Sequence, residues 1–119
     1  MISHWIGIVV GAAIVFLIIG KVFYGGSGVN GAAVKEKIKK GAMVIDVRTP
    51  AEYASGHFRG AKNIPLQDLQ GRLNELGNKS DAVVVYCASG MRSSQAVKIL
   101  SSSGFTEVLN AGGLSNLQE

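Results

Sequence analysis

Apolar and polar residues are distributed along the chain in blocks that predict one long apolar helix followed by a mixed domain. Ile2 to Gly20 contains no Asp, Glu, Lys or Arg. After it, short apolar runs typical of buried strands alternate with segments of helical spacing. The predicted strands are 42–47, 62–65, 82–86 and 106–110, and the predicted helices are 32–40, 49–55, 66–76 and 93–104. This alternation predicts an α/β fold with a parallel sheet covered on both faces.

Local signals indicate where several of these helices begin and end. Asn30 is a candidate cap for the first helix, and Gly41 follows its last residue. Thr49 and Pro50 suit the cap and the first helical position of the second helix. Gly71 interrupts the helical spacing of the third.

The N-terminal apolar segment is long enough to cross a membrane. At about 1.5 Å per residue, a helix from Ile2 to Gly20 spans roughly 28 Å, close to the hydrocarbon thickness of a bilayer. The alternatives are a cleaved signal peptide and a buried core helix. The first is disfavoured because no Lys or Arg precedes the segment, and the second because the segment has no polar face. We predict a transmembrane helix at 1–24, a Gly/Ser linker at 25–28 and one domain at 29–119.

Basic residues indicate the orientation of this anchor. Lys21 follows the apolar segment directly, and four more lysines lie between Lys35 and Lys40. The positive-inside rule then predicts a single-pass membrane protein whose domain is cytoplasmic, in a bacterial inner membrane. The lysines of 35–40 either lie against anionic lipid or form a solvated helix face.

Composition limits the chemistry. The chain has 119 residues, one Cys, two His and a formal net charge of +4. One Cys excludes an intramolecular disulfide, and one Cys with two His is too few ligands for a zinc site, so we expect no metal or cofactor. The charge suits an anionic substrate or a lipid surface. There is no basic stripe interleaved with aromatic residues, so we expect no nucleic-acid partner.

Cys87 stands where the third predicted strand ends and a helix is about to begin. Ligands of parallel sheets bind beyond this end of the strands. Ala88 to Met91 form a short loop in which Gly90 can take a positive φ, and successive backbone N–H groups in such a loop converge on an anion. These groups, the helix N-terminus and Arg92 favour thiolate over thiol. A small buried structural cysteine is the alternative, but the C-x-x-G-x-R spacing favours a catalytic thiol.

The loop Cys87-Ala-Ser-Gly-Met-Arg92 resembles the active-site loop of single-domain rhodaneses. Val44 to Pro65, VIDVRTPAEYASGHFRGAKNIP, is similar to the signature that precedes it, and GFTEVLNAGG matches the family's usual ending. The resemblance covers nearly all of the domain and implies a rhodanese-like α/β fold with a five-stranded, mainly parallel sheet. Two departures predict different C-terminal packing. Leu117 stands where members often have Trp, and the sequence stops at Glu119 where many continue into a further helix.

The resemblance implies a thiosulfate sulfurtransferase. Cys87 would attack the outer sulfur of a donor such as thiosulfate and become a persulfide, and a thiol, cyanide or a sulfur-accepting protein would then take the sulfur. Arg92 would be catalytic together with Cys87. The donor would bind the backbone of the loop residues Ala88, Ser89, Gly90, Met91 and Ser93.

Two other functions are compatible with a reactive cysteine at this position. A membrane-tethered persulfide carrier, or a docking module for another membrane protein, needs the same persulfide, and the sequence does not separate it from the enzyme. A phosphatase or arsenate reductase is disfavoured. The related enzymes of that kind separate their cysteine and arginine by five residues, whereas four separate Cys87 from Arg92. The shorter ring of N–H donors suits a single sulfur better than a phosphate.

Other polar residues near the loop are expected to be structural. Asp46, Arg48 and Glu52 should form ion pairs or capping bonds, because buried charges need partners. Ser93 either bonds the Cys87 sulfur or caps the helix, and capping is the expected role.

His57 is also expected to be structural. Arg59 and Lys62 either line the mouth of the site, where they would steer anionic donors, or face solvent. A solvated surface is the expected role for both.

Overall fold

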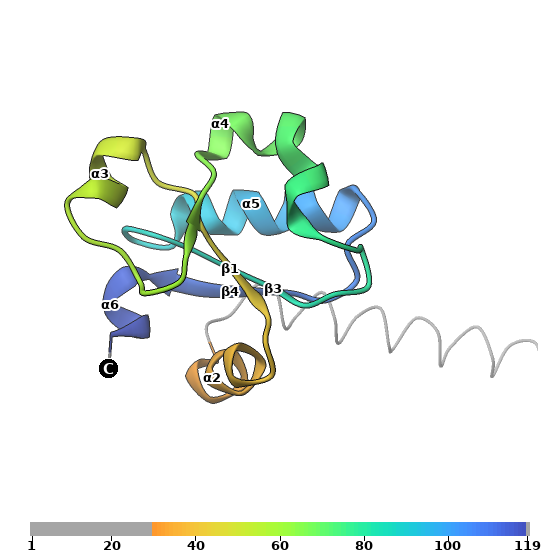
Figure 1. Cartoon of the computed structure of the whole chain (residues 1–119), viewed down its shortest axis with the longest axis horizontal. Coiled ribbons are helices and arrows are strands. Elements are labelled where there is room, and N and C mark those ends of the chain that lie inside the picture. Colours follow the sequence, from red (N-terminus) through yellow and green to blue (C-terminus); the bar gives the residue numbers. More distant parts are fainter. Residues whose placement is uncertain (1–29, 119) are drawn as a thin grey trace, which may run out of the picture.

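Four parallel strands form the sheet at the centre of the domain (Figure 1). The computed structural model describes residues 30–118. The strands are β1 (Met43–Asp46), β2 (Lys62–Asn63), β3 (Val83–Cys87) and β4 (Val108–Gly113). Their order across the sheet is β2-β1-β3-β4, so the two longest apolar runs of the domain, β1 and β3, lie at the centre. The predicted α/β fold with a parallel sheet is confirmed.

Over residues 30–118 the sheet has one strand fewer than the five that the resemblance implied. β2 ends one edge and is only two residues long. Pro65 follows it closely and has no N–H to donate to a ladder, so the chain leaves the sheet and enters a helix. At the other edge, β4 leads directly into α6 (Leu114–Leu117).

Helices cover both faces of this sheet (Figure 1). α4 (Leu66–Leu69), the 3-10 helix η1 (Gln70–Leu76) and α5 (Met91–Ser102) lie on one face, and α2 (Gly31–Lys39) and α6 lie on the other. The short helix α3 (Pro50–Ala54) follows the carboxyl end of β1. The domain therefore has three layers, with β3 at the middle of the central one.

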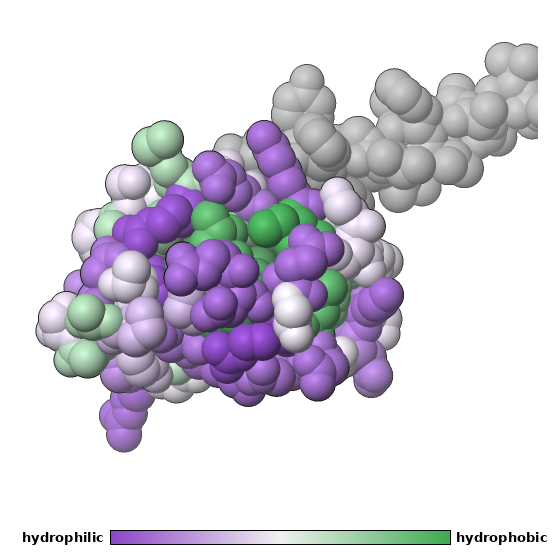
Figure 2. All heavy atoms as spheres, turned by 90° about the horizontal axis from the view of Figure 1, so that it is seen from above, coloured by the Kyte–Doolittle hydropathy of each residue, from purple (hydrophilic) through white to green (hydrophobic). Residues whose placement is uncertain are grey.

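Alternation of side chains along β3 divides the core into two clusters. Val83, Val85 and Cys87 face α4 and α5, whereas Val84 and Tyr86 face the side of α2 and α6. Successive strand residues point to opposite faces, so a strand covered on both sides has no polar side. Figure 2, which looks onto the α4 and α5 side, shows mainly hydrophilic side chains around a limited hydrophobic area.

Side-chain caps hold the first two helices of the domain as the sequence predicted. The Asn30 side chain accepts a hydrogen bond from the Ala33 N–H at 3.2 Å. At α3, the Thr49 hydroxyl accepts from the Glu52 N–H, and the Glu52 carboxylate accepts from the Thr49 N–H, each at 3.2 Å. This reciprocal pair is a capping box, and Pro50 follows it at the first helical position.

The first two predicted helices are offset by one residue at each end, and the other two differ by more. The predicted helix 66–76 is divided into α4 and η1, with a non-helical φ of −125° at Arg72, next to the interrupting Gly71. α5 begins at Met91, two residues before the predicted start at Ser93. The reason is Gly90, which turns the chain into the helix before the apolar spacing begins.

The C-terminal residues pack onto the core through Leu117. β4 continues three residues past the predicted end at Asn110, and the four residues of α6 bring Leu117 into the cluster that contains Val34 and Tyr86. Leu117 is only 8% exposed. Four residues are too few to show helical spacing, which is why the sequence did not predict α6.

The expected membrane anchor at 1–24 and linker at 25–28 lie outside the described residues. Among residues 30–118, no helix combines the length and the apolar character that crossing a bilayer requires.

Candidate active site

Cys87 is the last residue of β3 and is fully buried. Ala88 and Ser89, the first two residues of the following loop, are exposed. Gly90 then adopts a φ of +102° as the residue that begins α5. Residues with a side chain rarely take this conformation, so glycine is what allows the chain to turn back over the sulfur.

Backbone and side-chain groups of this turn contact the Cys87 sulfur. The Gly90 N–H donates to Sγ with an N–S distance of 2.9 Å, and the Ser93 hydroxyl oxygen lies 3.5 Å from Sγ. While Cys87 is a thiol, its S–H donates to this oxygen, and the Ser93 hydroxyl donates to the Gly90 carbonyl at 3.0 Å. Once Cys87 is a thiolate, the hydroxyl can turn and donate to the sulfur. The prediction that Ser93 caps the helix is wrong. Gly90 occupies the cap, and Ser93 lies in the first turn, buried against the sulfur.

These contacts and the burial of the side chain set the pKa of the Cys87 thiol. Burial raises the pKa of the thiol, because it disfavours the charged form. Hydrogen bonds from the Ser93 side chain and from the N–H groups of Ser93, Gly90 and Ser89 oppose burial and outweigh it. The pKa of Cys87 therefore lies below its ordinary value, which increases the fraction of reactive thiolate near neutral pH.

Two glycines at the end of β4 make room for the loop. A Cβ on Gly113 would lie 2.5 Å from the Ala88 carbonyl oxygen, a distance that side chains do not tolerate. A Cβ on Gly90 would in turn contact Gly112 at 3.6 Å. Cys87 and Gly113 are paired across the sheet. The glycines Gly112 and Gly113 therefore fix how closely the Cys87 loop approaches β4. The sequence did not predict this role.

Arg92 forms an ion pair with Glu52 rather than pointing freely into the loop. Its two terminal nitrogens donate to the two carboxylate oxygens at 2.7 and 2.9 Å. This pair raises the pKa of Arg92, and the charge of Cys87 raises it further. The sequence did not predict the partner of Arg92, which is 40 residues earlier in the chain. Within residues 30–118, no hydrogen bond joins Arg92 to the Cys87 sulfur.

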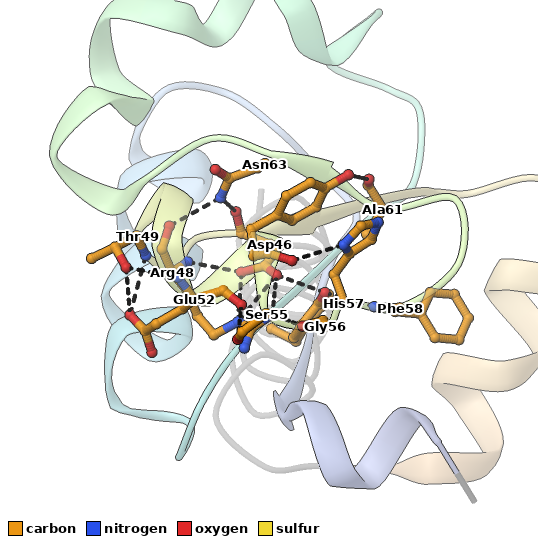
Figure 3. A network of polar contacts seen from close by, with 12 residues as sticks. Asp46, Arg48, Thr49, Glu52, Ser55, Gly56, His57, Phe58, Ala61 and Asn63 are labelled. Atoms are coloured by element: carbon orange, nitrogen blue, oxygen red, sulfur yellow. Dashed lines mark hydrogen bonds and ion pairs between the residues drawn. The ribbon is translucent and has the colours of Figure 1, made fainter.

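A buried polar network supports α3 and the loop that follows it (Figure 3). Asp46, at the end of β1, accepts three hydrogen bonds from the Arg48 side chain, at 2.7, 3.0 and 3.1 Å. The Tyr86 hydroxyl donates to Asp46 at 2.7 Å and accepts from the Phe58 N–H at 3.0 Å. Arg48 also donates to the Gly56 carbonyl. The predicted ion pairing of Asp46 with Arg48 is confirmed, and Glu52 serves the capping box and Arg92 instead.

His57, Arg59 and Lys62 make no hydrogen bond to the Cys87 sulfur. His57 is stacked on the Tyr53 ring, with centroids 3.6 Å apart, in agreement with a structural role. Lys62 pairs with Glu75 of η1 at 2.8 Å, and Arg59 is exposed. In α2, Lys37 forms an ion pair with Glu107, so it is part of the domain's own surface. Within residues 30–118, no three His, Cys, Asp or Glu side chains gather as a metal site would require.

Comparisons with known proteins agree with this arrangement. A family model described as "Rhodanese-like domain" matches residues 30–119. The chain is 47% identical to thiosulfate sulfurtransferase PspE of Escherichia coli (strain K12), over 61% of this chain and 71% of that protein. It is 34% identical to uncharacterized protein YqhL of Bacillus subtilis (strain 168), over 93% of this chain and 89% of that protein.

A solved structure confirms the fold. The structure described as "rhodanese with anions from E. coli" matches with a TM-score of 0.61 and 46% identity, covering 63% of this chain and 89% of that one. The chain therefore belongs to the rhodanese family, and its relatives support a role as a rhodanese-type sulfurtransferase.

The contact between Ser93 and the sulfur predicts a measurable change in the acidity of Cys87. Ser93→Ala removes a donor that lowers the thiol pKa, so the pKa should rise. Because Cys87 is the only cysteine, the pH dependence of alkylation by iodoacetamide reports this pKa directly. Alkylation of the variant should require a higher pH than alkylation of the wild type.

Ser94→Ala is the matched control, because Ser94 lies next to Ser93 but makes no hydrogen bond to Sγ in the structure. An unchanged alkylation profile in Ser93→Ala would show that the hydroxyl does not stabilise the thiolate.

Proposed function

We propose that this protein is a sulfurtransferase that carries sulfur as a persulfide on Cys87. The observation that carries the proposal is the thiol at the end of β3, surrounded by donors that lower its pKa. The thiolate would attack the outer sulfur of thiosulfate. As the new S–S bond forms, the S–S bond of thiosulfate breaks and its electron pair leaves with sulfite. A thiolate or cyanide would then attack the outer sulfur of the persulfide and release the Cys87 thiolate.

The loop residues have separate parts in this proposal. The N–H groups of Ser89, Gly90 and Ser93 stabilise negative charge on the sulfur. The backbone of Ala88 and Met91 would complete the loop that receives the donor. Because Cys87 is buried, a donor has to reach the sulfur through this loop, whose outer residues Ala88 and Ser89 are exposed. Arg92 would attract the anionic donor in competition with Glu52, its partner in the structure.

Sulfur loading of Cys87 can be measured directly. After incubation with thiosulfate, the intact mass of the wild type should increase by about 32 Da, the mass of one sulfur bound as a persulfide. Cyanide or dithiothreitol should reverse the increase, and Cys87→Ser should show none. An unchanged wild-type mass would refute persulfide formation from thiosulfate, and an adduct on Cys87→Ser would place the chemistry elsewhere.

The rate at which loaded Cys87 releases its sulfur to different acceptors separates an enzyme from a persulfide carrier. An enzyme should release the sulfur to small thiols or cyanide through many turnovers. A carrier should load Cys87 once and release the sulfur at a useful rate only to its partner protein.

We also propose that residues 1–24 anchor the domain to a membrane. The support is the charge-free apolar segment from Ile2 to Gly20 and the lysines that follow it. The similarity to YqhL spans 93% of the chain, so it extends into the residues before Asn30. A cytoplasmic domain would keep Cys87 in a reducing compartment, where a thiol remains free to attack.

Fractionation of cells that produce the full chain tests the anchor. The protein should appear in the membrane fraction, be protected from added protease in intact cells, and be digested after permeabilisation. A soluble form that begins near Gly25 would contradict the anchor and indicate a cleaved signal peptide. Digestion in intact cells would contradict the cytoplasmic orientation.

A further inference from the structure

The ion pair between Glu52 and Arg92 joins α3 to the first turn of α5 beside the Cys87 loop. Both side chains are about one third exposed, at 35% and 34%, so the pair is accessible to a donor in solution. The carboxylate bonds both terminal nitrogens of the guanidinium. It therefore occupies the fork with which an arginine binds an oxyanion.

Glu52 is held in this position by a second set of bonds. Its Oε1 also accepts from the N–H of Thr49 at 3.2 Å and from the Thr49 hydroxyl at 3.1 Å. Hydrogen bonding to Arg92, together with these bonds, lowers the pKa of Glu52 to about 2. The carboxylate is thus ionised at every pH at which the enzyme would act, and four hydrogen bonds fix its place.

The second guanidinium in this region is neutralised in the same way. Arg48 is close enough to Arg92 to lower its pKa, but it is paired with the buried Asp46 at 2.7 Å. Arg48, which follows β1, and Arg92, at the start of α5, are therefore each paired with a carboxylate and contribute little net positive charge. A dianion such as thiosulfate gains less binding free energy at such a site than beside an unpaired arginine, because each carboxylate repels it.

We propose that Glu52 is a specificity-determining residue whose carboxylate disfavours doubly charged sulfur donors relative to singly charged ones. This inference rests on the proposed function, since it concerns donors that load Cys87. The site is thereby matched to donors with one negative charge, such as the persulfide of a small thiol, more closely than to thiosulfate.

Two donors that share one reacting bond isolate the effect of charge. Thiosulfate carries two negative charges, and methanethiosulfonate carries one. Each presents an outer sulfur bonded to an oxidised sulfur. Attack by the Cys87 thiolate on either gives the same persulfide, and the S–S electron pair leaves with sulfite or with methanesulfinate. Steady-state kcat and KM for both donors, with cyanide as acceptor, give the preference of each variant.

Glu52→Gln removes the negative charge but keeps a side chain that can complete the capping box. The KM for thiosulfate should fall about three- to tenfold, the KM for methanethiosulfonate should fall less, and kcat should change little. Added salt should weaken the difference between the two donors. Glu52→Asp keeps the charge, so its preference between the donors should remain that of the wild type.

Glu75→Gln is the matched control for the loss of one charge. Glu75 also pairs with an arginine, Arg72, and has a pKa of about 2, but it lies in η1. Its replacement should leave both KM values unchanged. An equal change for the two donors in Glu52→Gln, or a rise in both KM values, would overturn the inference and make Glu52 a residue that only positions Arg92. Failure of the wild type to accept sulfur from either donor would instead refute the proposed function.

Discussion

Burial of the Cys87 sulfur opposes its ionisation, so the reactive thiolate depends on the hydrogen-bond donors around it. Those donors are backbone groups of one short turn and the Ser93 hydroxyl. Their positions depend on features far apart in the sequence. β3 brings the sulfur to the carboxyl end of the parallel strands, Gly90 turns the chain over it, and Gly113 lets the loop approach β4. The parallel sheet thus brings these separate segments together at one anion-binding site.

The positive charge of each arginine near the carboxyl ends of the strands is balanced by a carboxylate. Arg48 and Arg92 each have a carboxylate partner, one buried and one at the surface. The buried pair with Asp46 is joined by the Tyr86 hydroxyl and supports the loop after α3 (Figure 3). The surface pair with Glu52 links α3 to α5. Because backbone N–H groups and Ser93 stabilise the thiolate, the site can use its arginine charge to select which sulfur donors bind.

Local and periodic signals predicted most of the fold. The buried strands β1 and β3, the capping residues Asn30 and Thr49, and the thiol at a strand end all depend on neighbouring residues, which a sequence displays directly. Contacts between distant segments were not predictable in this way. The pairing of Glu52 with Arg92 and the approach of Gly113 to Ala88 depend on how the layers meet. The assignment of Ser93 as a cap failed because Gly90 starts α5 earlier than the apolar spacing indicates.

The close packing of the Cys87 loop against β4 is what stabilises the thiolate. The most direct test of this role is a thiolate titration of Gly113→Ala by ultraviolet absorbance, with Cys87→Ser as the baseline. The added Cβ would displace the Ala88 carbonyl, whereas Gly31→Ala meets no atom within 4 Å and serves as the control. The Cys87 pKa should be higher in Gly113→Ala and equal to that of the wild type in Gly31→Ala. A folded Gly113→Ala protein with the wild-type pKa would contradict this role of the packing.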